Sequence, residues 1–399
     1  MFGRFYEGNN IFDFNKIKNK IKMSVNAIKR EFVFPLINIS EYSITNHYKF
    51  GRFGHYHFCT HKKESKNYLV KILKKSVILE KDLFKKILAE LKLYQKLRNA
   101  QFFPRMIGIS TNDPKYLALF FKFPIGGRLR NLLSQQKKLS LEMSKFYVAN
   151  ILLIINELHK NKIIYRDLKI DTLFIKENGY LTLMDISYAK ELKKSTDKTY
   201  TLCGTPNYLA PEIILNKGYN FSVDFWSLGI IFFEMLMGKD PFHNKDPILI
   251  YQNILTNNKK FPKIIDRDAK ALINHLLVSE PEKRYGCLKN GINDIKNHRF
   301  YNDFKWDYLW EGVIEAPFLP TIEEGENVTK YFDQEKCNVK LKEKYLKKKE
   351  ENEKMKKEIQ ENKNTKTNKK LSLIEGAEVF DSDTEAKEIM ESDDPFLEW

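Results

Sequence analysis

The chain has 399 residues, which is enough for two packed lobes or domains with additional tails. Its hydrophobic content of 42%, with 29 Phe and 20 Tyr residues, predicts a large core with much aromatic packing. The net charge of +16 is uneven, because residues 340–370 hold 13 Lys against 6 Glu and residues 371–399 hold 10 acidic residues against one lysine. We interpret the basic segment as a solvated helix face, since nucleic-acid binding favours interleaved aromatic residues and Tyr345 is the only one there.

The cysteines and the apolar runs restrict the cellular setting. The four cysteines are isolated in the sequence, which favours a reducing compartment over a disulfide scaffold or a metal site. No uninterrupted apolar run approaches the length of a membrane span, and the N-terminus lacks a cationic segment followed by an apolar core. We therefore expect a soluble, cytoplasmic protein with no transmembrane segment and no nucleic-acid partner.

The first part of the chain is predicted to be mostly β-structure. Residues 1–41 form an N-terminal extension in which residues 14–34 are compatible with an amphipathic helix on the main body, although periodicity alone leaves this open. A helix is expected at residues 82–97. Runs of β-branched and aromatic residues predict strands at residues 48–60, 68–73 and 116–121.

From Gly126 onward the sequence predicts mainly helices. Apolar residues at three-four spacing predict a helix at residues 140–160, and residues 222–237 are apolar nearly all round, which is typical of a central buried helix. After residue 320 the sequence loses the periodic apolar pattern that indicates packed elements. We expect residues 340–370 to form an exposed helix or an unstructured tether. The terminal Phe396-Leu-Glu-Trp399 is compatible with an aromatic anchor for a groove or with a mobile end.

The sequence offers one set of candidate catalytic residues, which are Asp167, Lys169 and Asp185. Predicted strands at residues 173–175 and 180–184 flank Asn178-Gly179, a pair that tolerates the positive φ angles of a hairpin turn. This hairpin would return Asp185 to the loop that carries Asp167 and Lys169. Two carboxylates and a lysine on loops suit phosphoryl transfer, in which one carboxylate accepts a hydroxyl proton, the other holds a metal ion and the lysine neutralises charge.

Three further stretches carry a family resemblance: residues 199–219 (TYTLCGTPNYLAPEIILNKGY), 286–298 and 315–320 (EAPFLP). With these motifs the chain resembles the AGC group of eukaryotic serine/threonine protein kinases, and within it the catalytic subunits of cAMP-dependent protein kinase, over residues 42–333. The resemblance implies an α+β, bilobal protein kinase fold at residues 42–301, with a β-rich N-lobe over 42–124 and a helical C-lobe over 125–301. It also implies an AGC-type C-terminal tail at residues 302–399, whose aromatic motif at 396–399 folds back onto the small lobe.

The resemblance implies catalytic roles, with ATP and Mg²⁺ as cofactors and proteins as substrates. Asp167 matches the catalytic base and Lys169 a phosphate-contacting lysine. Lys71 matches the lysine that contacts the nucleotide phosphates, and Glu90 is its expected ion-pair partner. Asp185 matches the principal magnesium ligand, and Thr172 stands at the position of a second metal ligand. The expected nucleotide-binding residues are Phe50, Gly51, Gly54, Tyr56, Lys71, Phe121, Phe123, Phe174 and Asp185.

Activation and substrate binding are implied in the same way. Thr201 matches the activation-loop phosphorylation site, with Arg166, Lys190 and Lys86 as the cationic clamp for its phosphate. The expected substrate-binding residues are Arg128, Asp171, Glu234, Leu202, Pro206 and Leu209.

Three other residues are expected to have structural roles. Glu212 should pair with Arg284, and Asp224 should brace the catalytic loop.

Several positions depart from the family pattern. The glycine-rich loop begins with Lys49 in place of a glycine, and Ile186-Ser187 replaces Phe-Gly after Asp185. Thr172 replaces an asparagine, and a threonine hydroxyl is a poorer ligand for a hard cation than an amide carbonyl. Large side chains line the expected adenine pocket: Tyr56, Leu69, Phe121, Phe174 and Met184. In a close-packed interior they would displace the ligand, unless they rotate outward and the pocket is rearranged.

Arg128 reverses a charge in the expected substrate groove. It stands where the family has a glutamate that binds an arginine three residues before the phosphoacceptor. Repulsion between the two arginines predicts a weakened demand for that substrate residue. The same reversal weakens the inference that a cAMP-binding regulatory subunit is a partner, because such subunits place an arginine-bearing segment in this groove.

Two functions from different classes follow from the sequence. The first is a serine/threonine protein kinase that transfers the γ-phosphoryl group of ATP, with an atypical nucleotide pocket and altered recognition of basic substrates. The alternative is a pseudokinase, a binding or allosteric partner with little or no phosphotransfer. A third interpretation, a nucleic-acid or membrane-surface binder, rests on residues 340–370 alone.

Overall fold

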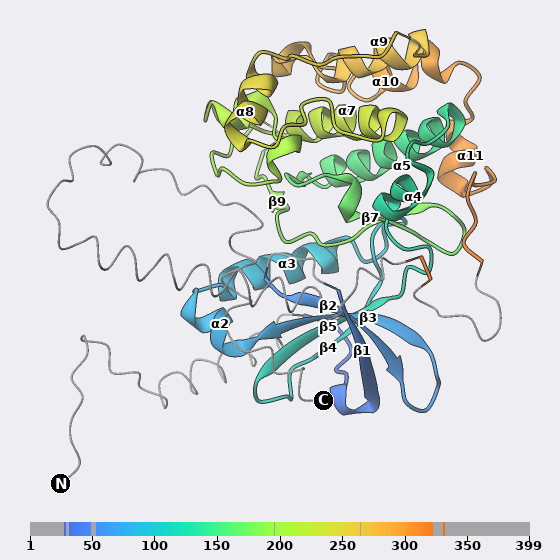
Figure 1. Cartoon of the computed structure of the whole chain (residues 1–399). Helices are drawn as coiled ribbons and strands as arrows, with labels where there is room; N and C mark the ends of the chain where they lie inside the picture. Colours follow the sequence, from blue (N-terminus) through green and yellow to red (C-terminus); the bar gives the residue numbers. More distant parts are fainter. Residues whose placement is uncertain are drawn as a thin grey trace, which may run out of the picture. The chain divides into compact units, whose positions relative to one another are not determined.

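The computed structural model of the chain describes residues 28, 32–48, 53–194, 196–263, 265–321 and 330–331. It divides into two compact units (Figure 1). The first unit comprises Met1–Asn99 and Pro104–Phe123, and the second comprises Ala100–Phe103 and Pro124–Trp399. The basic segment at residues 340–370 and the aromatic motif at residues 396–399 lie outside the described residues.

The first unit is built on one antiparallel sheet of five strands in the order β1-β2-β3-β5-β4. The strands are β1 (Tyr42–Tyr48), β2 (His55–His61), β3 (Asn67–Lys74), β4 (Met106–Ser110) and β5 (Tyr116–Lys122). Of residues 48–60, predicted as one strand, Tyr48 ends β1 and residues 55–60 belong to β2, while residues 49–52 lie outside the described part of the chain. Gly54 precedes β2, and a Cβ atom there would lie 2.5 Å from the Ile72 carbonyl oxygen, so only glycine fits against β3.

Two helices accompany this sheet, α2 (Lys75–Glu80) and α3 (Phe84–Lys96). The predicted helix at residues 82–97 corresponds to α3, whereas α2 was not predicted. Residues 32–38 run in an extended form along β4, because Ile37 N–H donates to the Ile109 carbonyl at 2.9 Å and Ile109 N–H donates to Pro35 at 2.9 Å. Of the helix considered at residues 14–34, Ile28 is helical and Phe32 N–H donates to its carbonyl at 3.2 Å, whereas residues 32–34 are not assigned as helix; most of the segment lies outside the described part of the chain.

The second unit is mainly helical. Its longest helices are α5 (Leu141–Lys160) and α7 (Ser222–Met237), which have the predicted bounds to within one residue. Every residue from Ser222 to Met235 is buried, as expected for a helix that contacts α5 on one side and α9 (Arg267–Leu276) on another. The shorter helices are α4 (Leu129–Gln136), α6 (Pro211–Ile214), α8 (Pro247–Leu255), α10 (Asn293–Lys296) and α11 (Trp306–Glu311).

Short strands and 3₁₀ turns position the loops of this unit. The strand pairs are β6 (Ile163–Ile164) with β9 (Lys190–Glu191), and β7 (Leu173–Ile175) with β8 (Leu181–Leu183). The 3₁₀ turns are η2 (Ile170–Thr172), η3 (Pro206–Tyr208), η4 (Pro281–Lys283) and η5 (Arg299–Tyr301), and η1 (Ile39–Glu41) lies in the first unit.

The β7–β8 hairpin confirms the turn predicted at Asn178-Gly179. Leu173 pairs with Leu183, and Met184 N–H donates to the Thr172 carbonyl at 2.9 Å, so the residue that follows returns to the loop before β7. Gly179 has φ +77°, and a Cβ there would lie 2.4 Å from that of Ala316. The turn thus needs glycine both for its backbone conformation and for packing against residues 315–320.

No helix in the part of the chain that the structure describes is both long and apolar enough to cross a membrane.

Glu212 and Arg284 form the expected ion pair inside the second unit. Arg284 donates two hydrogen bonds to the carboxylate, at 2.7 and 3.0 Å, and a third to the Ser222 carbonyl at 2.8 Å. Arg284 is 0% exposed and Glu212 is 4% exposed, so neither charge can be hydrated if its partner is lost. The pair joins α6, α7 and the residue after η4.

We predict that Arg284→Ala lowers the free energy of unfolding by about 3–5 kcal/mol, because Glu212 would stay buried without its counter-ion. Arg299→Ala is the matched control, since Arg299 also pairs with a carboxylate, Asp268, but is 47% exposed. Its loss should cost less than about 1 kcal/mol. Urea unfolding of both variants makes the comparison, and equal costs would contradict the role given to the Arg284 pair.

Candidate active site

Lys71 on β3 and Glu90 on α3 form a buried ion pair in the first unit. The Lys71 Nζ and Glu90 Oε1 atoms are 2.7 Å apart, and their side chains are 0% and 2% exposed. The Lys71 ammonium also lies 5.5 Å from the ring centroid of Tyr56, which faces Lys71 in the β2–β3 register. The predicted ion pair is therefore present, and a tyrosine ring adds a cation–π contact to the lysine.

Asp167, Lys169 and Thr205 form a closed cluster in the second unit. Thr205 Oγ1 donates to Asp167 Oδ1 at 2.8 Å, and Lys169 Nζ lies 3.1 Å from Asp167 Oδ2. Lys169 Nζ also donates to Thr205 Oγ1 at 2.6 Å. Sequence reasoning gave no role to Thr205, although it lies in the tripeptide Gly204-Thr205-Pro206 of the family motif at residues 199–219. The threonine fixes both the carboxylate and the ammonium in one orientation.

The Asp167 carboxylate has a perturbed affinity for protons. Burial raises its pKa above the ordinary value; the Lys169 charge and the Thr205 hydrogen bond act in the opposite direction, and the charge of Asp185 adds to the rise. A raised pKa brings a carboxylate closer to the range in which it can accept and release a proton. The interaction between Asp167 and Asp185 also shows that two negative charges lie near one another, which favours a cation.

Asp185 follows β8 in the left-handed region, with φ 58°. Its Oδ1 atom accepts hydrogen bonds from the Ser187 N–H at 3.2 Å and from the Ser187 hydroxyl. The Tyr165 hydroxyl donates to the Asp185 carbonyl at 2.8 Å and so ties this loop to the residue two before Asp167. Ser187, which replaces the usual glycine, therefore holds the carboxylate through its side chain.

The donor atoms fit one magnesium ion better than two. An ionised carboxylate has about four lone-pair sites, so Asp185 can hold a cation as well as Ser187. Mg²⁺ is commonly held by one or two carboxylates together with substrate phosphates. Thr172 offers a single hydroxyl oxygen, which donates to the Lys169 carbonyl at 2.9 Å and accepts from the Lys169 N–H at 3.4 Å, so it has less free lone-pair capacity than a carboxylate. Among the described residues, no cluster of three or more His, Cys, Asp or Glu side chains could hold a metal ion.

The large residues expected around adenine are buried. Tyr56, Leu69 and Phe121 of the first unit are each 0% exposed, and Phe123 is 9% exposed. The ring centroids of Tyr56 and Phe121 are 6.2 Å apart, and Tyr94 lies 5.0 Å from Phe121 on the other side. In the second unit, Phe174 and Met184 are also 0% exposed. The rings of the first unit therefore pack together and do not rotate out into solvent. Lys49, Phe50 and Gly51 of the glycine-rich loop lie outside the described residues.

Around the expected phosphorylation site, Lys190 forms a hydrogen bond with the neighbouring Thr199. Thr201 is exposed, whereas Thr199 is buried and accepts a hydrogen bond from Lys190 Nζ at 3.0 Å. Partial burial lowers the Lys190 pKa, and the positive charge of Arg166 lowers it further. Two neighbouring cations are suited to an anion such as a phosphate. Lys86, the third predicted member, belongs to the first unit and lies 5.7 Å from the Phe53 ring centroid.

Two of the predicted substrate residues, Asp171 and Glu234, bind an arginine that sequence reasoning missed. Asp171 and Glu234 both accept hydrogen bonds from the guanidinium of Arg130. Arg128 precedes α4 and pairs through its backbone with Phe174. Leu209 is buried, while Leu202 and Pro206 keep part of their surface exposed. The sequence contained no signal for Arg130, because it lies 41 residues before Asp171 and 104 before Glu234.

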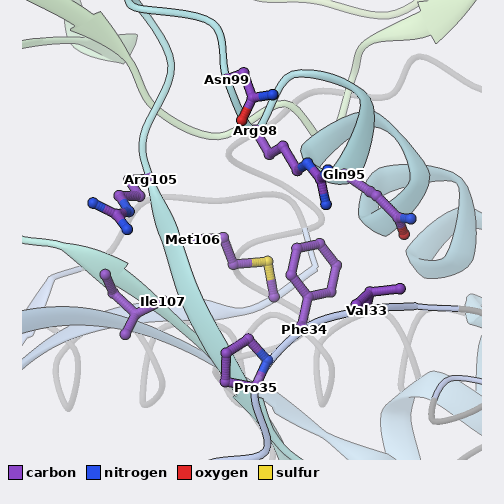
Figure 2. Close-up of a pocket in the computed structure, with 9 residues that line it drawn as sticks. All are labelled: Val33, Phe34, Pro35, Gln95, Arg98, Asn99, Arg105, Met106 and Ile107. Carbon is purple, nitrogen blue, oxygen red and sulfur yellow. The ribbon is translucent and has the colours of Figure 1, made fainter.

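Two cavities in the described part of the chain are lined by residues other than these. One of about 280 Å³ is in the first unit, between residues 33–35, the end of α3 and the start of β4. Figure 2 shows its Phe34 and Met106 side chains pointing toward one another. The other, about 440 Å³, is lined by polar residues such as His275, Tyr285 and Asn293. Neither cavity contains a residue predicted for the active site.

Asp224 of α7 braces the catalytic loop, as expected. Its carboxylate is 0% exposed and accepts hydrogen bonds from the backbone N–H groups of Tyr165 and Arg166, each at 3.0 Å. His159 Nε2 lies 2.8 Å from the same carboxylate. Arg166 has φ 74°, an unfavourable conformation for a non-glycine residue, so the loop depends on these bonds.

We predict that Asp224→Ala lowers the free energy of unfolding by roughly 3 kcal/mol or more, since two buried N–H groups would lose their acceptor. Amide exchange at Tyr165 and Arg166 should accelerate more than exchange within α5 and α7. Asp240→Ala is the control, because Asp240 is also buried but binds Phe242 N–H and Asn207 instead. If Asp240→Ala accelerated exchange at Tyr165 equally, the specific bracing role would be wrong.

Comparison with known proteins identifies the family of the chain. The protein kinase domain family matches residues 44–301, more than half of the chain. The chain is 37% identical over 290 residues to the cAMP-dependent protein kinase catalytic subunit of Dictyostelium discoideum, a match covering 71% of this chain and 44% of that protein. It is 35% identical over 296 residues to cAMP-dependent protein kinase type 3 of Saccharomyces cerevisiae, covering 74% of this chain and 73% of that protein. For the cAMP-dependent protein kinase catalytic subunit 3 of Drosophila melanogaster the identity is 35% over 298 residues, covering 74% of this chain and 50% of the relative. This chain therefore belongs to the protein kinase family and is homologous to the catalytic subunits of cAMP-dependent protein kinases.

Proposed function

We propose that this chain is a serine/threonine protein kinase that transfers the γ-phosphoryl group of ATP to protein hydroxyl groups. The observation that carries this proposal is the closed cluster of Asp167, Lys169 and Thr205, with the Asp185 charge close to it. The cluster supplies a proton acceptor and a cation that are both held in place before substrate arrives. Such preorganised groups provide most of the catalysis in phosphoryl transfer.

The proposed reaction uses each group once. Asp167 accepts the proton of the substrate hydroxyl, whose oxygen forms a bond to the γ-phosphorus as the bond to the β-phosphate oxygen breaks and leaves ADP. Lys169 neutralises charge on the transferring group, and Lys71, aligned by Glu90, binds nucleotide phosphates. Mg²⁺ held by Asp185 would supply charge neutralisation for the same phosphates.

Three features support slow rather than efficient transfer. Tyr56 is buried over Lys71, the Thr172 hydroxyl is directed to the Lys169 carbonyl, and Ser187 binds the Asp185 carboxylate. We infer an atypical nucleotide pocket that must shift the Tyr56 ring before adenine enters. The same three features favour the second candidate function, a pseudokinase that binds partners with little or no transfer.

Regulation and partners follow from the resemblance to the relatives. We propose that Thr201 is phosphorylated and that Arg166 and Lys190, with Lys86, bind that phosphate. Protein substrates are the expected partners. A cAMP-binding regulatory subunit is a weaker expectation, because Arg128 stands where an acidic residue would bind its arginine.

We predict that Mg²⁺ and ATP together raise the melting temperature of the full chain and that phosphate appears on Thr201. Asp185→Asn should abolish the thermal shift, since it removes the charged ligand. Asp167→Asn should keep the shift but reduce transfer by roughly 10²–10⁴-fold, because only the proton acceptor is lost. Thermal scans and mass spectrometry at Thr201 report the two steps separately. A wild-type chain with neither thermal shift nor transfer would refute the enzyme proposal.

Thr172 gives a second prediction. Thr172→Asn should lower the Mg²⁺ concentration needed for half-maximal nucleotide binding severalfold, because an amide carbonyl is a better ligand for a hard cation than a hydroxyl that is bonded to the Lys169 backbone. Thr172→Val is the control, since it has a similar shape without the hydroxyl. Isothermal titration of ATP at a series of Mg²⁺ concentrations checks both variants. A weaker Mg²⁺ response in Thr172→Val would show that the threonine already serves as a ligand.

A further inference from the structure

Arg130 on α4 is held by three polar residues from three other segments of the second unit. Its Nε atom lies 3.2 and 3.3 Å from the two Asp171 oxygens, and its NH2 group donates to Asp171 Oδ2 at 2.9 Å. NH1 donates to Glu234 Oε1 at 2.5 Å, and NH2 also donates to the Tyr208 hydroxyl at 3.0 Å. The Tyr208 hydroxyl in turn donates to Glu234 Oε2. All three nitrogens of the guanidinium are therefore bound.

This pocket has the chemistry of a guanidinium-binding site. Two carboxylates and a phenol oxygen surround a planar cation, an arrangement for which arginine is better suited than lysine. Glu234 is 5% exposed at its side chain, so its charge needs a buried counter-ion. Burial raises the pKa of Glu234, and the Arg130 charge opposes this rise. The site thus requires a cation, and α4 provides it from within the chain.

Two residues of this pocket are close in the chain to Asp167 or Thr205, where the substrate hydroxyl is proposed to bind. Asp171 lies in η2, four residues after Asp167 on the same loop, and its charge acts on Lys169. Tyr208 lies in η3, three residues after Thr205, which is bonded to Asp167. A peptide whose hydroxyl reaches Asp167 must pass close to these segments. Asp171 and Arg130 are 34% and 27% exposed, so both present some surface to such a peptide.

We propose that Arg130 is a specificity-determining residue that occupies, within the chain, the acidic subsite beside the catalytic loop and excludes basic substrate residues from it. This inference rests on the proposed function, because it assigns the substrate class of the same site. The two carboxylates carry two negative charges, and Arg130 cancels one of them. A substrate arginine gains little from the remainder and can bind fully only by displacing Arg130. The preferred peptides therefore carry neutral residues at this subsite.

The test measures peptide binding and does not depend on phosphoryl transfer. Two fluorescein-labelled peptides are compared by anisotropy on the full chain, both with alanine in place of the phosphoacceptor. One carries two arginines before the spacer residue, as Arg-Arg-x-Ala, and the other carries leucines there. The wild-type chain should bind the arginine peptide no more than about threefold better than the leucine peptide. Arg130→Met removes the guanidinium from Asp171 and Glu234 but keeps an unbranched side chain. This variant should bind the arginine peptide roughly tenfold or more tightly than the leucine peptide.

Two further variants test whether the new preference for the arginine peptide depends on Glu234 and is specific to Arg130. Arg130→Met combined with Glu234→Gln should lose most of the new preference, because the deepest carboxylate is neutral. Arg299→Ala, which removes an arginine from a carboxylate elsewhere in the same unit, should bind both peptides as the wild type does.

The wild-type comparison keeps the proposal falsifiable even if Arg130→Met does not fold. A wild-type chain that prefers the arginine peptide tenfold overturns the proposal, as does a folded Arg130→Met with the wild-type ratio. An absence of phosphoryl transfer in all variants would count against the proposed function alone, since the peptide ratios are measured without ATP.

Discussion

The Asp224 carboxylate is the constraint on which the catalytic loop depends. Two consecutive backbone N–H groups, of Tyr165 and Arg166, point at one buried side chain on α7. Without that acceptor, both amides would be buried and unsatisfied, and the positive φ of Arg166 would have nothing to compensate it. Because α7 is buried along almost its whole length, the carboxylate cannot move to follow the loop. The rigid helix thereby fixes the backbone immediately before Asp167.

From this fixed point the site is extended by side chains on neighbouring segments. Tyr165 links the loop to the Asp185 carbonyl, and Thr205 links it to the segment before η3. Each link is a hydrogen bond from a hydroxyl, whose proton can rotate to suit its acceptor. Asp167 is consequently placed by three separate stretches of chain, and its raised pKa arises from the burial that this arrangement imposes. The position of the proposed catalytic carboxylate and its perturbed proton affinity therefore have one origin.

The departures from the family pattern share a physical theme. Several polar groups of the proposed site have a polar partner within this chain. Ser187 binds Asp185, Lys169 receives the Thr172 hydroxyl at its carbonyl, and Arg130 binds Asp171 and Glu234. Each internal partner satisfies a buried group that would otherwise be costly. The Ser187 contact also competes with the magnesium ion that we propose at Asp185, and the Arg130 contacts compete with a substrate residue at Asp171 and Glu234.

The sequence by itself determined the fold class, the long helices and the hairpin that carries Asp185. These follow from local rules: apolar periodicity for α5 and α7, turn chemistry for Asn178-Gly179, and motif spacing for Asp167 and Lys169. It also predicted the pairs Lys71–Glu90 and Glu212–Arg284, because family motifs fix both partners. Only the tertiary structure decided that Thr205 completes the Asp167 cluster, that the Tyr56 ring is buried over Lys71 and that Arg130 fills the acidic pocket. These contacts join residues far apart in the chain, where no periodicity or spacing relates one partner to the other, and the orientation of each side chain is set by packing.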